Sequence, residues 1–120
     1  MKVGVTGLIL AVCLSAACAN DPTAGDEPPP EWLTALIADL ESQPVANPSA
    51  LIARYEYQGQ SVYYVPPRCC DVPSDVYDAS GTIICHADGG LDGAGDGRCS
   101  DFFQSRSSEE IIWRDPRGGS

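Results

Sequence analysis

The chain has six cysteines and one histidine, and those in its second half have the types and spacing for covalent or metal chemistry. They are Cys69, Cys70, Cys85, His86 and Cys99. Thiolates and an imidazole can bind zinc, but structural zinc sites usually contain C-x-x-C pairs, and this chain has none. An even set of cysteines in a short exported chain is typical of a disulfide framework. We therefore predict disulfides rather than a metal site, with His86 as a surface residue beside a crosslink.

The adjacent cysteines limit how this framework can be connected. A disulfide between neighbours strains the peptide that joins them, so Cys69 and Cys70 are not expected to bond to each other. Neighbouring side chains on an extended backbone point to opposite faces, so the two residues could crosslink different elements. Two pairings remain: Cys69–Cys85 with Cys70–Cys99, or Cys69–Cys99 with Cys70–Cys85. Each crosslink would stabilise the fold by about 3 kcal/mol.

An aspartate- and glycine-rich segment separates the last two cysteines. Asp88, Asp92 and Asp96 recur at every fourth position, between glycines that permit sharp turns. Carboxylates and backbone carbonyls are the ligands that Ca²⁺ prefers, yet the segment lacks the order of an EF-hand and its closing glutamate. The sequence favours a loop in which Asp caps turns and Gly supplies positive φ, with no cofactor. A calcium site is the alternative.

The first residues are typical of a bacterial secretion signal, which we place at 1–18. Lys2 supplies a positive charge, an apolar run follows over residues 3–12, and small residues precede Cys18. This run is too short for a membrane-spanning helix, which needs about 20 apolar residues. The small residues favour a lipoprotein signal, in which Cys18 is lipidated and begins the mature chain. The alternative is cleavage after Ala19, which would release a soluble protein.

The rest of the chain divides into three parts. Residues 19–30 are rich in proline and acidic residues, as expected of a tether. Residues 31–115 would form a single compact domain, and residues 116–120 a disordered tail. The predicted location is the cell envelope, with attachment to a membrane through the N-terminal lipid.

The charge balance narrows the range of partners. The chain has 17 acidic residues against 7 basic ones, a formal net charge of −10. Such a surface repels phosphate backbones, so a nucleic-acid partner is not expected. It also opposes electrostatic binding to anionic lipid. A protein or small-molecule partner of unknown identity remains.

Hydrophobic spacing predicts the elements that must position these residues. Apolar residues at helical spacing indicate a helix over 31–43. Alternation of apolar and polar residues predicts strands over 51–58 and 61–65, which would pair as a hairpin. A second hairpin is expected around Gly81, and a last strand over 109–114. The fold class is therefore α+β: a small antiparallel sheet with one packed N-terminal helix, crosslinked by two disulfides.

Several motifs in this domain resemble those of a known family. They are Tyr63-Tyr64-Val65-Pro66-Pro67, Cys69-Cys70-Asp71, Tyr77-Asp78, Gly81, Ile84-Cys85, Asp88-Gly89-Gly90, Gly95-Asp96-Gly97, Cys99 and Asp101-Phe102. Together they are similar to a family of short, cysteine-containing bacterial lipoproteins catalogued as a domain of unknown function. The resemblance covers residues 31–103. It implies export and one compact domain, and it implies no activity.

No motif indicates catalysis. The chain lacks the G-x-S-x-G and H-E-x-x-H signatures, and no two carboxylates are marked as an acid–base pair. We therefore expect a non-catalytic binding or structural module of the envelope, not an enzyme. One alternative is an inhibitor of a secreted enzyme that presents the loop between Cys85 and Cys99. The other is a calcium-binding module that uses the aspartates of that loop.

Overall fold

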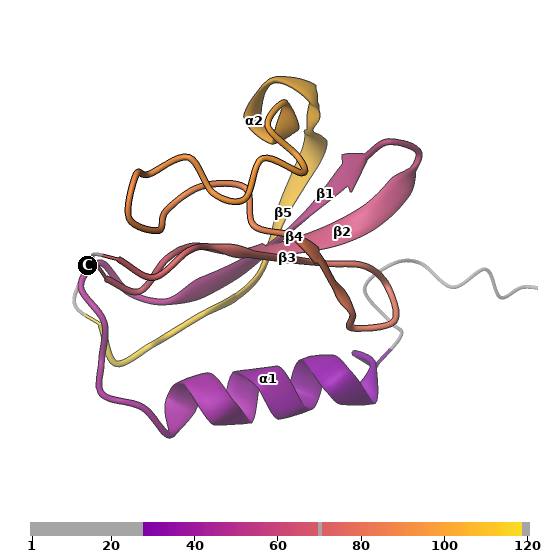
Figure 1. The fold of residues 1–120 in the computed structure, drawn as a ribbon. Coiled ribbons are helices and arrows are strands. Elements are labelled where there is room, and N and C mark those ends of the chain that lie inside the picture. Colours follow the sequence, from indigo (N-terminus) through magenta and orange to yellow (C-terminus); the bar gives the residue numbers. More distant parts are fainter. Residues whose placement is uncertain (1–27, 70, 119–120) are drawn as a thin grey trace, which may run out of the picture.

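A five-stranded antiparallel sheet is covered on one face by a helix and on the other by a long irregular segment (Figure 1). The computed structural model describes residues 28–69 and 71–118. Its elements are α1 (Glu31–Glu41), β1 (Leu51–Tyr57), β2 (Gln60–Val65), β3 (Asp75–Tyr77), β4 (Ile83–Cys85), α2 (Phe102–Ser105) and β5 (Ser107–Arg114). The strands lie in the order β4-β3-β2-β1-β5. The predicted α+β class and antiparallel sheet are confirmed, and α2 is an additional short helix that the sequence analysis did not expect.

The β1–β2 hairpin lies at the centre of the sheet and buries both of its faces. Its two-residue turn places Gln58 and Gly59 at φ values of 52° and 78°, the left-handed conformation that such turns require. The register pairs Tyr55 with Val62. Alternate residues along each strand point to opposite faces, and most of them are buried. Two hydrophobic clusters therefore form, one on each side of the hairpin.

The first cluster lies between the sheet and α1. Leu33 and Leu40 are buried at helical spacing, and both face the sheet. Trp32 contacts the ring of Tyr63 edge-on, with a centroid distance of 5.2 Å, and stacks on Tyr77 at 5.5 Å. Its indole Nε1 donates a hydrogen bond to the carbonyl of Ala79, at 2.9 Å. The helix is thus fixed to the sheet at its first turn by rings and at its last turn by Leu40.

The second cluster lies under the segment that connects β4 to β5. The side chain of Phe102, in α2, is fully buried. It makes edge-on contacts with Tyr55 and Tyr57 and stacks on Tyr64 at a centroid distance of 5.5 Å. Tyr57 donates a hydrogen bond from its hydroxyl to Asp101. Burial, followed by this hydrogen bond, raises the pKa of Tyr57 to about 12.

One disulfide closes this segment, and it corrects the expected framework. Among the described residues, Cys85 is bonded to Cys99, with a Cα–Cα distance of 6.1 Å. Both pairings predicted from the sequence are therefore wrong, because each bonded these two residues to Cys69 or Cys70. Cys70 lies outside the described residues. The physical reason is that the glycine-rich loop folds back on itself, which returns Cys99 to the end of β4.

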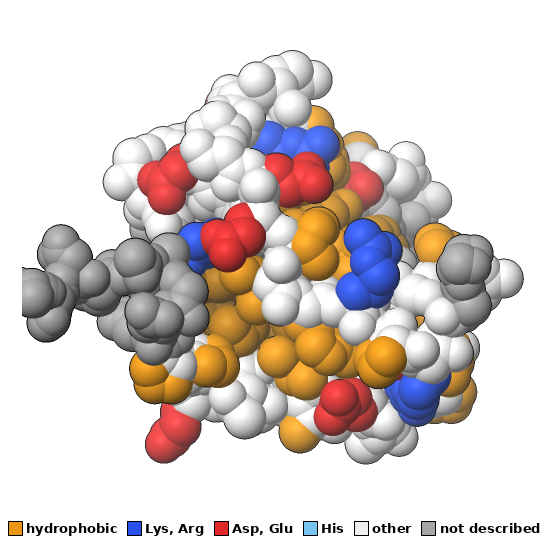
Figure 2. Space-filling model, turned by 180° about the vertical axis from the view of Figure 1, so that it is seen from behind, with side chains coloured by type: hydrophobic (Ala, Val, Ile, Leu, Met, Phe, Trp, Pro, Cys, Tyr) orange, Lys and Arg blue, Asp and Glu red, His pale blue; other side chains and the backbone are white. Residues whose placement is uncertain are grey.

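The outer strand β5 leaves apolar side chains at the surface. It pairs only with β1, through a register that is shifted at two places. Ile111 is 41% exposed. Figure 2, which views the molecule from behind, shows hydrophobic side chains in the middle of this surface with charged side chains around them. None of the helices in the described part of the chain has the length and apolar content needed to cross a membrane.

The contact between Gly81 and Trp32 gives a test of how α1 is held. Gly81 has φ +91°, and a Cβ there would lie 2.6 Å from Cγ of Trp32. Gly59 has a similar φ of +78°, with no atom within 4 Å of such a Cβ. Both Gly→Ala variants should lose about 1–2 kcal/mol from the left-handed backbone. Gly81→Ala should lose about 1–3 kcal/mol more, because Trp32 must move.

Urea unfolding followed by tryptophan fluorescence measures this difference directly. Gly59→Ala is the matched control for backbone strain. Equal losses in the two variants would contradict the tight packing of Trp32 against the β3–β4 turn.

Candidate functional site

A cavity of about 400 Å³ lies at the end of the sheet where α1 ends. Because the sheet is antiparallel, the start of β1 and the ends of β2 and β5 meet at this edge. The lining comes from all of these elements and from the loop between α1 and β1: Leu40, Ala46, Asn47, Pro48, Ser49, Ala50, Leu51, Val65, Pro66, Pro67, Arg68, Arg114 and Gly118. Ligand pockets commonly combine such an apolar wall with a few polar groups. We therefore take this cavity as the candidate site.

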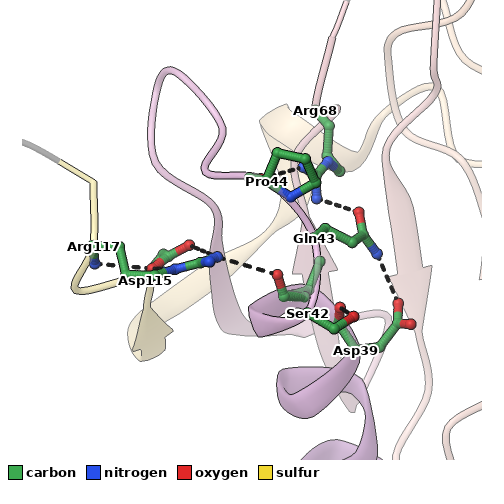
Figure 3. A network of polar contacts seen from close by, with 8 residues as sticks. Asp39, Ser42, Gln43, Pro44, Arg68, Asp115 and Arg117 are labelled. Atoms are coloured by element: carbon green, nitrogen blue, oxygen red, sulfur yellow. Dashed lines mark hydrogen bonds and ion pairs between the residues drawn. The ribbon is translucent and has the colours of Figure 1, made fainter.

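Arg68 connects one wall of the cavity to the end of α1 (Figure 3). Its guanidinium donates one hydrogen bond to Oε1 of Gln43 and another, of 2.9 Å, to the carbonyl of Pro44. Gln43 in turn donates from Nε2 to the carboxylate of Asp39, at 2.9 Å. These bonds fix the position of Arg68. Both acceptors of Arg68 are neutral, so its positive charge is not cancelled by the groups that hold it.

An ion pair that involves a buried carboxylate holds the other side of this helix end. The side chain of Asp115 is 1% exposed, and its carboxylate accepts hydrogen bonds from Arg117 at 2.7 Å and 3.0 Å. Arg117 also approaches the carbonyl of Leu40, at 3.4 Å. The backbone N–H of Asp115 donates to the carbonyl of Ala50, at 2.9 Å. The hydrogen bonds from Arg117 hold the pKa of Asp115 below its usual value.

The arginines of the described residues differ in how their charges are balanced. Arg54, Arg98 and Arg117 form ion pairs with carboxylates. Arg106 lies over aromatic rings, 4.6 Å from the centroid of Tyr55. Arg68 and Arg114 form no direct ion pair with a carboxylate in the described part of the chain, although the charge of Arg68 helps to lower the pKa of nearby Asp115. They are also the arginines that line the cavity.

This arrangement is suited to binding an anion. Guanidinium groups donate in a planar fork that matches a carboxylate or a phosphate. Arg68 uses two of its donor groups on Gln43 and Pro44, and no hydrogen bond of the Arg114 side chain is found within the described residues. Apolar side chains such as Leu51 and Val65 form the rest of the wall. The cavity therefore offers positive charge next to apolar surface.

The aspartates predicted as calcium ligands lie in separate turns. Asp88 accepts a hydrogen bond from the hydroxyl of Tyr64, at 3.0 Å. Asp92 and Asp96 each accept a bond from the backbone N–H two residues further on, at 3.0 Å. Across residues 28–69 and 71–118, no group of three histidine, cysteine or acidic side chains is arranged to hold a metal. Asp88 thus connects the loop to the sheet, and calcium binding stays an untested prediction.

The loop between Cys85 and Cys99 is compact rather than extended. The N–H of Gly89 donates to the carbonyl of Gly93, and that of Gly95 donates to the carbonyl of Gly89. Leu91 is 89% exposed at the outside of this loop. The loop therefore presents one apolar side chain on an internally bonded backbone.

The remaining predicted residues lie away from the cavity or outside the described residues. The Nδ1 atom of His86 lies 2.7 Å from the carbonyl of Ser74 and 3.1 Å from the carboxylate of Asp75. Cys69 follows β2 at the surface. Cys18, the predicted lipidation site, and the whole of the predicted signal 1–18 lie outside the described residues.

Arg68 and Arg114 are not predicted as site residues from the sequence. They are separated by 46 positions in the sequence, and nothing in either local pattern relates one to the other. The only sequence feature that could have drawn attention to them is composition, because every basic residue after Lys2 is an arginine. Composition alone does not indicate which arginines lack an acidic partner in the fold.

Comparison with protein-family models places most of the chain in a known family. Residues 38–115 match a model described as a domain of unknown function (DUF6970). The match begins inside α1 and ends after β5, so it includes the sheet and all of the cavity lining except Gly118. Neither the search of curated proteins nor that of solved structures found a match. The expected domain of unknown function is confirmed, and lipidation stays a prediction.

The Asp115–Arg117 pair predicts how stability at this corner depends on pH. A carboxyl group whose pKa is lowered by folding stabilises the native state above its unfolded pKa of about 3.9. This contribution is lost as the pH falls through the lower pKa of the folded state. The melting temperature of the wild type should therefore fall more steeply between about pH 5 and pH 3 than that of Asp115→Asn.

The control for this measurement is Asp71→Asn, which removes an exposed carboxylate that forms no hydrogen bond or ion pair with the described residues. Its pH profile should follow that of the wild type. If Asp115→Asn also follows the wild type, the ion pair does not contribute to the acid sensitivity of the fold.

Proposed function

Because this chain belongs to the family of the domain of unknown function DUF6970, we propose a function from its own residues: it is a non-catalytic binding module of the cell envelope. Its site would be the cavity at the end of α1. The observation that carries this proposal is that Arg68 and Arg114 line one largely apolar cavity and form no direct ion pair within the described residues. The chain has a net charge of −10, so carboxylates are plentiful, yet none is in direct contact with these two guanidinium groups among the described residues.

The location of the cavity suits a protein attached through its N-terminus. In our proposal, Cys18 is lipidated, and residues 19–30 connect the membrane to α1. The tether would join the domain at the first turn of α1, whereas the cavity is lined by Leu40 in the last turn. An 11-residue helix is about 16 Å long, which separates the two ends. A ligand could then approach the cavity from the side away from the attachment point.

Replacement of the lipidated cysteine tests the anchor. Wild-type protein expressed in a bacterial host that processes lipoproteins should partition into the detergent phase of Triton X-114. The Cys18→Ala variant should move to the aqueous phase, because it lacks the cysteine that would carry the acyl chains. Stable membrane attachment needs two or more such chains. Cys13→Ala, within the predicted signal, is the matched control and should remain in the detergent phase.

Intact mass of the mature protein gives an independent readout. A mature chain that begins at Cys18 and carries acyl groups supports the anchor. A chain that begins at Asn20 would overturn it and favour the soluble alternative.

Titration with a neutral apolar probe tests the cavity as a binding site. We expect 1-hexanol to shift the backbone amide resonances of Ser49, Leu51 and Arg68 in ¹H–¹⁵N spectra. Ala46→Phe should abolish these shifts, because the new ring would fill the cavity that Ala46 lines. Ala35→Phe is the matched control, since Ala35 is exposed on α1.

Shifts distributed over the whole surface, or equal shifts in Ala46→Phe and wild type, would contradict a site at the cavity.

The two alternative functions, calcium binding and enzyme inhibition, can be tested with the same protein. Shifts at Asp88, Asp92 and Asp96 on addition of CaCl₂ would favour the calcium-binding module. The exposed Leu91 favours an enzyme inhibitor as the second candidate, and inhibition of chymotrypsin that is lost in Leu91→Asp would support it.

A further inference from the structure

We propose that the ligand of this cavity is a monocarboxylate with a short apolar chain. The inference rests on the proposed function, because it names the chemical class that the same cavity takes. The carboxylate would lie between the guanidinium groups of Arg68 and Arg114. The apolar chain would lie against Leu40, Leu51 and Val65.

The unused hydrogen-bond donors of the two arginines favour a ligand with an anionic head group. Arg68 is held in place by Gln43 and Pro44, and its remaining donors are not used by another residue of the described chain. The side chain of Arg114 has no hydrogen bond or ion pair within that part of the chain, so its guanidinium is available to a ligand. Hydrogen bonds between a guanidinium and a carboxylate are among the strongest in proteins. Two such groups at one cavity supply both charge and orientation.

The surroundings favour a single negative charge over the double charge of a phosphate. Phosphates are commonly bound by the backbone N–H groups at the first turn of a helix. The helix end at this cavity is instead the carboxyl end of α1, which carries partial negative charge. The protein also carries a net charge of −10. Both features raise the free energy of a multiply charged ligand more than that of a monoanion.

The wall of the cavity favours a ligand with an apolar chain. Leucine, valine, proline and alanine side chains make up most of the lining. Burying apolar surface against such a wall contributes about 0.8 kcal/mol per CH₂ group. The free energy of binding should therefore become more favourable as the chain of the acid lengthens, until the cavity is full.

Titration of the mature chain with hexanoate and hexanamide tests this inference. The two probes have the same apolar chain and differ in the charge of the head group. We expect hexanoate to bind about tenfold more tightly, because only its charged carboxylate forms an ion pair with the guanidinium groups. Arg114→Gln should weaken hexanoate binding about tenfold and leave hexanamide unchanged. Arg98→Gln makes the same charge change in the distant glycine-rich loop and should alter neither.

The outcomes separate this inference from the proposed function. Equal affinities for hexanoate and hexanamide, both lost in Ala46→Phe, would overturn the carboxylate while keeping the binding cavity. Tighter binding of inorganic phosphate than of hexanoate would overturn it as well. No binding of either six-carbon probe would overturn both proposals. Tighter binding of N-acetylleucinate than of hexanoate would keep the carboxylate chemistry and assign its source to a peptide terminus.

Discussion

The fold depends on the burial of both faces of the β1–β2 hairpin. Ile52, Tyr63 and Val65 point to one side, while Tyr55, Val62 and Tyr64 point to the other. A two-stranded hairpin cannot bury two apolar faces alone, so each face needs a separate cover. The chain supplies α1 before the hairpin and the segment from β4 to α2 after it. The outer strands are placed by pairing, β5 with β1 and β3 with β2.

The two covers differ in how far they could be predicted. The apolar residues of α1 recur at helical spacing between Pro30 and Pro44, so local pattern was enough to place that helix. The second cover is irregular, and its contact with the sheet is made mainly by Phe102, in a helix of four residues. A single turn has too few residues for a periodic signal. This is why α2 was missed while the strands around it were found.

The disulfide illustrates the same limit. The prediction for Cys69 and Cys70 relied on the direction of neighbouring side chains, which is a local property. The bond between Cys85 and Cys99 depends on the path of the 13 residues between them, as these two positions are 14 apart in sequence. Positive φ at Gly89, Gly93 and Gly95 turns that path back on itself. Glycine content indicated turns in this segment, but it could not indicate where the turns would bring the second cysteine.

The candidate site was beyond sequence reasoning for a different reason. Whether an arginine is available to a ligand depends on which carboxylates the fold places beside it. The chain contains more acidic than basic residues, so most arginines are expected to find a partner, as Arg54 does with Glu110.

Arg68 is an exception because the groups that accept its hydrogen bonds at the helix end are neutral. The last carbonyls of α1 and of the following loop need hydrogen-bond donors, and Arg68 and Arg117 supply them. Arg117 also forms an ion pair with the buried carboxylate of Asp115, whereas Arg68 donates its hydrogen bonds only to neutral oxygens. The need to cap one helix thus leaves a fixed positive charge at the wall of an apolar cavity, and Arg114 adds a second at the end of β5. The side chain of Arg68 thus both satisfies carbonyl groups at the end of α1 and supplies positive charge to the cavity.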